Sequence, residues 1–171
     1  WKALDNGMNQ IKSWLGGNTV FTSVSATGSG RRLAAEKFKT AIIKNEITCQ
    51  AVSALSHQPG VRTIIEIGGQ DSKLIIVRGG LVADFSMNSV CAAGTGSFLD
   101  HQAARLGISF SEMNRLAEKS RSPVAVNAAC TVFAESDMIT RQQSGSPVED
   151  IVYGLCKALV NNFQRGLIQS K

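Results

Sequence analysis

Residues 62–86, RTIIEIGGQDSKLIIVRGGLVADFS, constrain the fold more than any other stretch of the chain. They contain three apolar runs rich in β-branched residues, at 62–67, 73–78 and 81–85. The letters GGQD separate the first two runs, and Gly79-Gly80 separates the last two. Adjacent glycines between such runs are typical of a tight hairpin, because both central residues of the turn can take positive φ. The pattern predicts three short strands, the last two joined by a hairpin.

Helical periodicity dominates the rest of the chain. Apolar residues recur at three- and four-residue spacing, which is typical of helices with one buried face. The predicted helices cover 2–15, 31–38, 49–56, 97–107, 109–119, 131–144 and a last segment that begins after Pro147. Two further apolar runs, 18–28 and 41–43, are predicted to be strands. The length of 171 residues suffices for one domain with a hydrophobic core.

The net charge of +5 comes entirely from the N-terminal third of the chain. Residues 1–62 contain eight Lys and Arg against three Asp and Glu, whereas residues 63–171 contain ten of each. The basic residues are not interleaved with aromatic ones, as they often are on surfaces that bind nucleic acids. This distribution favours a solvated basic face over a nucleic-acid-binding surface.

Composition also restricts the class of protein. No apolar run approaches the roughly 20 residues of a membrane-spanning helix, and no charged and then apolar leader opens the chain. The cysteines Cys49, Cys91, Cys130 and Cys156 are too few and too widely spaced for the disulfide scaffold of a small secreted domain. We therefore expect a soluble, cytoplasmic protein.

The segment EIGGQDSK, residues 66–73, is the first that could carry chemistry. Two glycines at the end of a strand allow backbone N–H groups to approach an anion closely, as in phosphate-binding turns. Glu66, Gln70 and Asp71 could then position a Mg²⁺ ion or a water molecule. An ordinary turn has the same pattern, so the residues alone leave both interpretations open.

Cys91 and Cys130 form the second constellation. They precede two predicted helices, in CAAGTGSFLDHQAARLG and CTVFAESDMITRQQ. A helix N-terminus carries partial positive charge and N–H donors, so it lowers the pKa of a nearby thiol and stabilises an anionic group. Two thiolates in this setting suit an iron–sulfur cluster, which needs four ligands. Two copies of the chain across a two-fold axis would complete the set.

Other roles for the cysteines stay open at this level. A zinc site of four cysteines would normally show paired C-x₂₋₄-C spacings, which this sequence lacks. A covalent nucleophile, as in thiolases, needs an activating histidine, and only His57 and His101 are present. A small buried residue is the commonest fate of a single cysteine. Cys156 falls on the apolar stripe of the last predicted helix and is expected in the core, and Cys49 in the core or in a loop.

Three segments, in this order, resemble one known family: RTIIEIGGQDSK, DFSMNSVCAAGTGSFLD and ACTVFAESDMI. They are similar to the ATP-dependent activators of 2-hydroxyacyl-CoA dehydratases, a family that also includes the ATPase subunits of benzoyl-CoA reductases. GSFLDHQAARLGI and DMITRQQSG most resemble the long multidomain activases, in which such a module is one part of a larger chain. The resemblance covers about residues 24–160.

This resemblance implies an α/β fold of the acetate kinase, sugar kinase, Hsc70 and actin type, which is ribonuclease H-like. It implies that Cys91 and Cys130 hold one [4Fe–4S] cluster shared between the two subunits of a homodimer. It implies a second phosphate-binding loop, for ATP or ADP with Mg²⁺, that comprises Gly68, Gly69, Gln70, Asp71, Ser72 and Lys73. The residues to which it assigns catalysis are Glu66, Gln70 and Asp71.

The activity that the resemblance implies is electron delivery. ATP binding and hydrolysis would reshape the helices around the cluster, and one low-potential electron would pass to a partner dehydratase or reductase of CoA esters. The alternatives are a non-redox, kinase-like nucleotide-binding domain of the same fold and a module that serves dimerisation alone. No nucleic-acid or membrane partner is expected.

The sequence departs from the family pattern at several points. Glu66 stands where many members have Asp, and Gln50 follows Cys49 where His is expected. An early Asp-x-Gly-Ser-Thr run and a late adenine-binding Gly-Gly turn are not found. We therefore expect residues 1–60 to be the incomplete end of a first subdomain. Residues 61–171 would be a second, C-terminally incomplete subdomain with the phosphate hairpin and the cluster helices. The parent protein would be an ATPase, whereas this chain alone is expected to bind ATP poorly.

Overall fold

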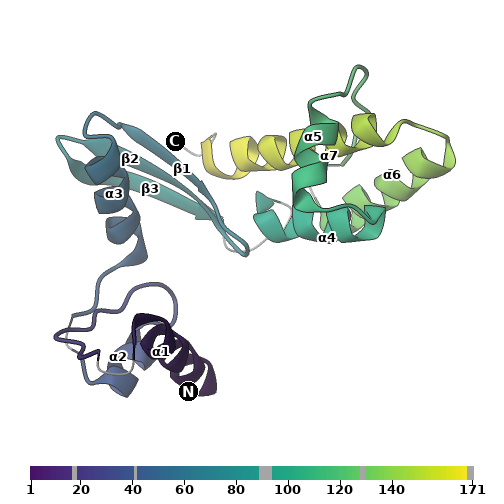
Figure 1. Ribbon diagram of the computed structural model, residues 1–171. Coiled ribbons are helices and arrows are strands. Elements are labelled where there is room, and N and C mark those ends of the chain that lie inside the picture. Colours follow the sequence, from purple (N-terminus) through teal and green to yellow (C-terminus); the bar gives the residue numbers. More distant parts are fainter. Residues whose placement is uncertain (17–18, 41, 89–93, 128–129, 169–171) are drawn as a thin grey trace. The chain divides into compact units, whose positions relative to one another are not determined.

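The computed structural model describes residues 1–16, 19–40, 42–88, 94–127 and 130–168 (Figure 1). Its helices are α1 (Lys2–Leu15), α2 (Arg31–Phe38), α3 (Glu46–His57), α4 (Gly96–Leu106), α5 (Phe110–Ala117), α6 (Thr131–Gln143), α7 (Val148–Phe163) and a π-helical turn, η2 (Gln164–Ile168). Its strands are β1 (Thr63–Ile67), β2 (Ser72–Arg78) and β3 (Leu81–Asn88). The chain divides into two compact units, Trp1–Val61 with Gly80–Val82, and Arg62–Gly79 with Ala83–Lys171.

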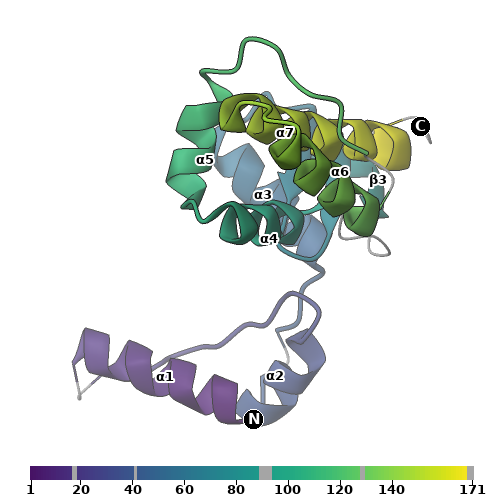
Figure 2. The same cartoon turned by 90° about the vertical axis from the view of Figure 1, so that its right-hand side faces the viewer.

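The first unit contains α1, α2 and α3. Figure 2 shows α1 and α2 meeting near the N-terminus, where an ion pair joins Asp5 of α1 to Lys37 of α2 with 2.7 Å between Oδ1 and Nζ. The Lys37 Nζ also lies 5.3 Å from the centre of the Trp1 ring. Asn45 caps α3, because its side chain accepts a hydrogen bond from the N–H of Ile47 at 2.8 Å. The helices predicted at 2–15, 31–38 and 49–56 are confirmed, although α3 begins earlier than expected.

The two strands predicted in this unit are wrong. Within the described parts of 18–28 and 41–43, the two segments pair only at a single parallel bridge between Ala26 and Ile43. Its backbone bonds join Ala26 to the carbonyl oxygen of Ile42 at 2.9 Å and to the N–H of Lys44 at 3.0 Å. A strand persists only where a neighbour pairs its backbone groups along its length. These segments touch at one point, so their β-branched residues do not form a sheet.

The sheet matches its prediction from the apolar runs. Within the described residues, β1, β2 and β3 are neighbours in that order. β1 and β2 are antiparallel, and their register places Glu66 opposite Lys73. Gly79 and Gly80 have φ values of 58° and 76°, so the tight hairpin between β2 and β3 is confirmed. This register brings the charged residues of EIGGQDSK together at one end of two strands.

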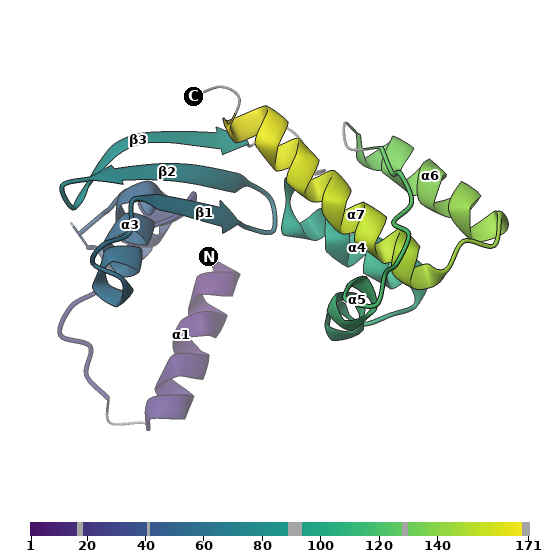
Figure 3. The same ribbon diagram turned by 90° about the horizontal axis from the view of Figure 1, so that it is seen from above.

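The core of the second unit lies among α4, α5, α6 and α7 (Figure 1). Its largest contribution is a stripe of buried residues on α7, namely Ile151, Val152, Leu155 and Leu159. Phe98, Met113 and Met138 bring α4, α5 and α6 onto this stripe. Figure 3 shows α7 continuing from these helices to the sheet, where Phe163 and Leu167 pack on Leu74 of β2. The helix α7 therefore connects the helical core to the strand that bears Lys73.

The helix ends of the second unit follow the predicted signals. Gly107, with φ 69°, ends α4, and the hydroxyl of Ser109 accepts a hydrogen bond from the N–H of Glu112 at 3.2 Å at the start of α5. Pro147 precedes α7, whereas α5 ends at Ala117, slightly before its predicted end. None of the helices in the described ranges is long and apolar enough to cross a membrane.

Asp150, in the first turn of α7, anchors the segment that follows α5. Its Oδ1 accepts hydrogen bonds from the hydroxyl of Ser120 at 2.7 Å and from the N–H groups of Arg121 at 3.0 Å and Ser122 at 2.9 Å. The bonds from Ser120 and Ser122 are the main reason that the pKa of the Asp150 carboxyl lies below its ordinary value of 3.8; burial opposes them, and Arg121 reinforces them. The folded structure therefore stabilises the ionised form of the Asp150 carboxyl.

We expect acid to destabilise the second unit partly through Asp150. A carboxyl whose pKa is lowered by folding stabilises the protein above its unfolded pKa, and this contribution is lost as the pH falls from about 3.8 through the folded pKa. Asp150→Asn keeps an acceptor oxygen but not the charge, so its melting temperature should fall less than that of the wild type between about pH 5 and about pH 3. Thermal unfolding followed by circular dichroism checks this. Asp100→Asn, at an exposed site on α4, should keep the wild-type dependence; the same dependence in Asp150→Asn would contradict the prediction.

Candidate functional site

The predicted phosphate loop is the turn 68–71 between β1 and β2. The N–H of Gly68 donates to the carbonyl oxygen of Asp71 at 2.9 Å and closes the turn. A Cβ at position 68 would lie 3.0 Å from Glu66 Oε1 and 3.1 Å from the Asp71 carbonyl oxygen, so only glycine fits there without a shift. Gly69 and Gln70 are exposed. The backbone at the tip of the turn is therefore exposed to solvent, as it is in turns that bind anions.

Lys73 is buried beside this turn. Its side chain is 1% exposed, and its Nζ lies 2.9 Å from Glu66 Oε2 and 2.5 Å from Asp71 Oδ1. The side chains of Glu66 and Asp71 are 28% and 29% exposed. A buried ammonium needs partners that compensate for its lost hydration. The structure thus gathers three of the predicted site residues, Glu66, Asp71 and Lys73, into an ion-paired cluster.

This cluster limits what each group can do. The charge of Lys73 is directed at two carboxylates, so the lysine holds Glu66 and Asp71 in place. Each carboxylate remains partly exposed and has a second oxygen, which can contact a hydrated Mg²⁺ ion or orient a water molecule. The longer side chain of Glu66, where Asp was expected, is accommodated by its ion pair with Lys73. The catalytic roles of Glu66, Gln70 and Asp71 stay predictions.

The loop is bonded directly to the start of α4. The N–H of Gly96 donates to the carbonyl oxygen of Gly68 at 2.8 Å, and the N–H of Ser97 donates to that of Gly69 at 3.1 Å. A Cβ at position 96 would lie 3.2 Å from the Gly68 carbonyl oxygen, so glycine allows this close approach. These two N–H groups are therefore occupied by the loop. They are therefore not among the donors that the start of α4 can offer to an anionic group.

Ser72, at the start of β2, makes a third bond to this region. It is fully buried, and its hydroxyl donates to the carbonyl oxygen of Gly94. Gly94 follows Cys91 by three positions in the sequence. The described chain on the C-terminal side of Cys91 is thus held by the turn 68–71 and by the strand that follows it.

Of the two predicted cluster ligands, Cys91 and Cys130, the structure describes only Cys130. Cys91 lies outside the described residues. Cys130 immediately precedes α6, is half-buried, and makes no capping hydrogen bond with its side chain. Among the described residues, no three of His, Cys, Asp and Glu gather closely enough to hold a metal ion. Ligation by Cys91 and Cys130 stays a prediction.

The remaining cysteines are half-buried on helices. Cys49 lies within α3, so it is neither in a loop nor fully in the core. Cys156 lies on α7 next to Leu155, but only Leu155 is fully buried. Successive residues of a helix point about 100° apart, which turns Cys156 partly away from the core. Burial still raises the pKa of the Cys156 thiol above its ordinary 9.0, so it is a poor source of thiolate at neutral pH.

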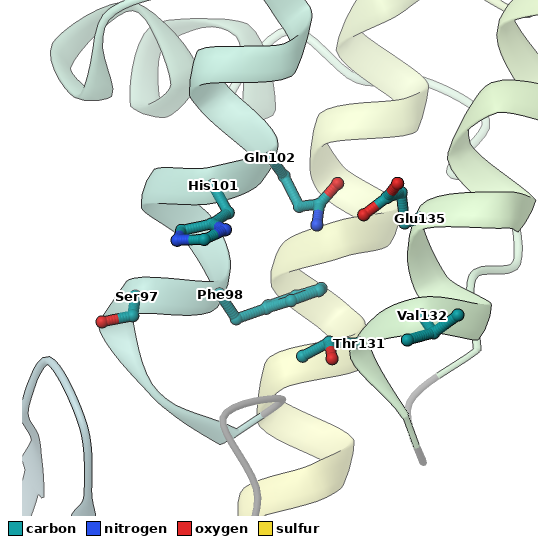
Figure 4. Close-up of a pocket in the computed structure, with 7 residues that line it drawn as sticks. All are labelled: Ser97, Phe98, His101, Gln102, Thr131, Val132 and Glu135. Atoms are coloured by element: carbon teal, nitrogen blue, oxygen red, sulfur yellow. The ribbon is translucent and has the colours of Figure 1, made fainter.

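A pocket of about 180 Å³ lies between α4 and α6 (Figure 4). Its lining consists of Ser97, Phe98, His101 and Gln102 from α4 and of Thr131, Val132 and Glu135 from α6. His101 is on the exposed side of its helix, and Glu135 pairs with Arg105 at 2.7 Å between Oε1 and Nη2. Sequence analysis missed the pocket, because its two walls are separated by α5 in the chain and no local pattern joins them.

Comparison with known proteins identifies the family of the chain. Residues 7–167 match the BadF/BadG/BcrA/BcrD ATPase family. The chain belongs to that family. Within it, the (R)-2-hydroxyglutaryl-CoA dehydratase activating ATPase of Acidaminococcus fermentans is 42% identical over 117 residues, which cover 68% of this chain and 45% of the relative. The 2-hydroxyisocaproyl-CoA dehydratase activator of Clostridioides difficile is 38% identical over 133 residues, 77% of this chain and 49% of the relative.

A similar solved structure confirms the fold class. The activator of the 2-hydroxyisocaproyl-CoA dehydratase from Clostridium difficile with bound ADPNP superposes with a TM-score of 0.83 at 32% identity, over 92% of this chain and 59% of that chain. The expected α/β fold of an actin-like ATPase is therefore confirmed. The chain spans about half the length of the relatives that it matches.

Proposed function

We propose that this chain is part of an ATP-driven iron–sulfur electron donor that activates a 2-hydroxyacyl-CoA dehydratase or an acyl-CoA reductase of the benzoyl-CoA type. The observation that carries the proposal is the 42% identity to a protein named as a dehydratase activating ATPase. The partner would be a CoA-ester dehydratase or reductase.

The phosphate loop supports the nucleotide half of this proposal. Gly69 and Gln70 are exposed at the tip of the turn, and the carboxylates of Glu66 and Asp71 are oxygen donors of the kind that Mg²⁺ prefers. Lys73 keeps both carboxylates in place through ion pairs of 2.9 Å and 2.5 Å. Gly68, Gly69, Gln70 and Ser72 would complete the loop around the phosphates of ATP or ADP.

The cysteines support the redox half. Cys130 is half-buried at the start of α6, beside the first N–H groups of the helix, which have no partner within it. Cys91 and Cys130 give two ligands per chain, so a homodimer would supply the four thiolates of a [4Fe–4S] cluster. The cluster would contribute a one-electron redox centre. Hydrogen bonds join residues 68, 69 and 72 to residues 94–97, just before and at the start of α4. Through these bonds, a movement of the nucleotide-binding loop would shift the start of α4, which follows Cys91 in the sequence.

Anaerobic reconstitution with iron and sulfide tests the proposal. The protein should become brown and contain about two iron atoms per chain, because four irons would be shared by two chains. Cys91→Ser and Cys130→Ser should each remove the colour and most of the iron. Cys49→Ser and Cys156→Ser are matched controls and should keep both. Iron and sulfide analysis, visible absorption and size-exclusion chromatography give the readouts.

The outcomes separate the proposed functions. An iron content that Cys130→Ser leaves unchanged would contradict the redox assignment. A protein that stays colourless but binds nucleotide would favour the kinase-like alternative. A colourless dimer that binds no nucleotide would leave only the dimerisation module.

A further inference from the structure

Two described residues, Asn88 and Gly94, flank the short segment that contains Cys91. Residues 89–93 lie outside the described part of the chain, and Cys91 is the central residue of these five. A Cβ at Gly94 would lie 3.0 Å from Asn88 Nδ2, so the two flanking residues are also neighbours in space. Fixing both ends of a short segment reduces the number of conformations open to it. The contacts of Asn88 and Gly94 therefore restrict where Cys91 can lie.

Gly94 is held by groups from three elements of the second unit. A Cβ at this position would lie 3.5 Å from Asn162 Oδ1 and 3.6 Å from Asn162 Cγ, which places the Asn162 amide of α7 against Gly94. Asn88 comes from the end of β3, and the buried hydroxyl of Ser72 in β2 donates to the Gly94 carbonyl oxygen. Figure 3 shows the end of β3 beside the C-terminal part of α7. Asn162 thus joins α7 to the chain that follows Cys91.

The backbone of α7 at Asn162 is firmly placed. The next residue, Phe163, is 5% exposed and packs with Leu167 on Leu74 of β2. The preceding residue, Asn161, lines a different pocket, between α7 and residues 123–126. Successive residues of a helix point about 100° apart, so the two adjacent asparagines face different parts of the unit. Asn162 is the one that faces Gly94.

We propose that Asn162 is a positioning residue for Cys91. Its amide holds Gly94 and thereby the backbone between Cys91 and α4, and it does so without adding a charge beside a thiolate. The inference rests on the proposed iron–sulfur function, in which Cys91 is a ligand. Groups that orient metal ligands typically change the affinity for the metal by about 10- to 100-fold when they are replaced.

Alkylation of the metal-free chain with iodoacetamide tests this inference without a cluster. Mass spectrometry of the peptides gives a separate rate for each of the four cysteines. Asn162→Leu keeps a similar volume but removes the amide, so Cys91 should react about two- to ten-fold faster relative to Cys130, the range that the loss of one polar contact gives. Gly94→Ala, whose Cβ would press on the Asn88 amide, should have the same effect. A general loss of stability would instead accelerate all four cysteines together.

The reconstituted protein gives a second readout. A chelator should remove iron from Asn162→Leu about ten-fold faster than from the wild type, and the EPR spectrum of the reduced protein should change. The matched control is Asn161→Leu, the same substitution at the preceding, also half-buried position of α7. It should keep the wild-type values in both assays.

Equal Cys91 rates in Asn162→Leu and the wild type would overturn the inference, as would the same acceleration in Asn161→Leu. The two assays also separate it from the proposed function. A selective acceleration of Cys91 in a protein that takes up no iron would support the positioning role and contradict the redox function. Iron uptake by the wild type, with no effect of Asn162→Leu in either assay, would contradict only the positioning role.

Discussion

Gly154→Ala should destabilise the second unit more than any other single methyl group added to a described glycine. A Cβ at this position would overlap the carbonyl oxygen of Val124 and lie 3.1 Å from the Cγ2 of Val126. Val124 cannot easily retreat, because its N–H donates to the Asp150 carbonyl oxygen at 3.2 Å. Overpacking costs about 1–3 kcal/mol and more where backbone has to move, so we expect a loss of about 3 kcal/mol or more.

Urea denaturation followed by circular dichroism measures this loss as a change in the free energy of unfolding. Gly7→Ala is the matched control, since Gly7 lies within α1 and a Cβ there meets nothing within 4 Å. That change should be neutral or stabilise by up to about 1 kcal/mol, because alanine favours helix over glycine. Equal stability of Gly154→Ala and the wild type would show that the segment around Val124 adapts without cost.

Lys73→Met should also destabilise the protein strongly. Methionine fills a similar volume, so the main loss is the cation that lies 2.9 Å from Glu66 Oε2 and 2.5 Å from Asp71 Oδ1. Breaking a buried ion pair by removing one partner typically costs about 3–5 kcal/mol. Here more than a quarter of each carboxylate side chain is exposed and hydrated, which reduces the cost. We expect a loss of about 2–4 kcal/mol.

A combined variant distinguishes loss of charge balance from loss of packing. Glu66→Gln and Asp71→Asn together with Lys73→Met remove all three charges, so the triple variant should recover most of the lost stability. Lys157→Met, at an exposed site on α7, is the matched control and should change stability by less than about 0.5 kcal/mol. Denaturant unfolding gives all four values. A triple variant as unstable as Lys73→Met would show that packing, not charge, makes Lys73 important.

The features that the sequence predicts correctly are those set by neighbouring residues. Gly79 and Gly80 determine the hairpin because only the local φ angles matter, and Ser109 and Gly107 mark helix ends for the same reason. The strand predicted at 18–28 fails because a strand depends on a partner elsewhere in the chain, and within the described residues Ala26 pairs at one point. Local preference alone cannot supply that partner.

The candidate site also has features that the local sequence predicts and features that it does not. The grouping of Glu66, Asp71 and Lys73 follows from a short turn between two strands, so the letters EIGGQDSK predict their proximity. The bonds from the loop to α4 join backbone groups, which any residue has. Only Gly96, which the close approach requires, could have indicated them in the sequence. The pocket between α4 and α6 leaves none, since its two walls come from helices that α5 separates in the chain.

The hydrogen bonds between the turn and α4 also restrict evolutionary change. Inserting or deleting one residue between Ile67 and Ser72 would shift the carbonyl groups of Gly68 and Gly69 out of line with the amides of Gly96 and Ser97. The length of this turn is therefore fixed by a helix far along the chain rather than by the two strands that it joins. Homologous sequences should vary in length at exposed connections, such as the turn after α6, and keep the same number of residues here.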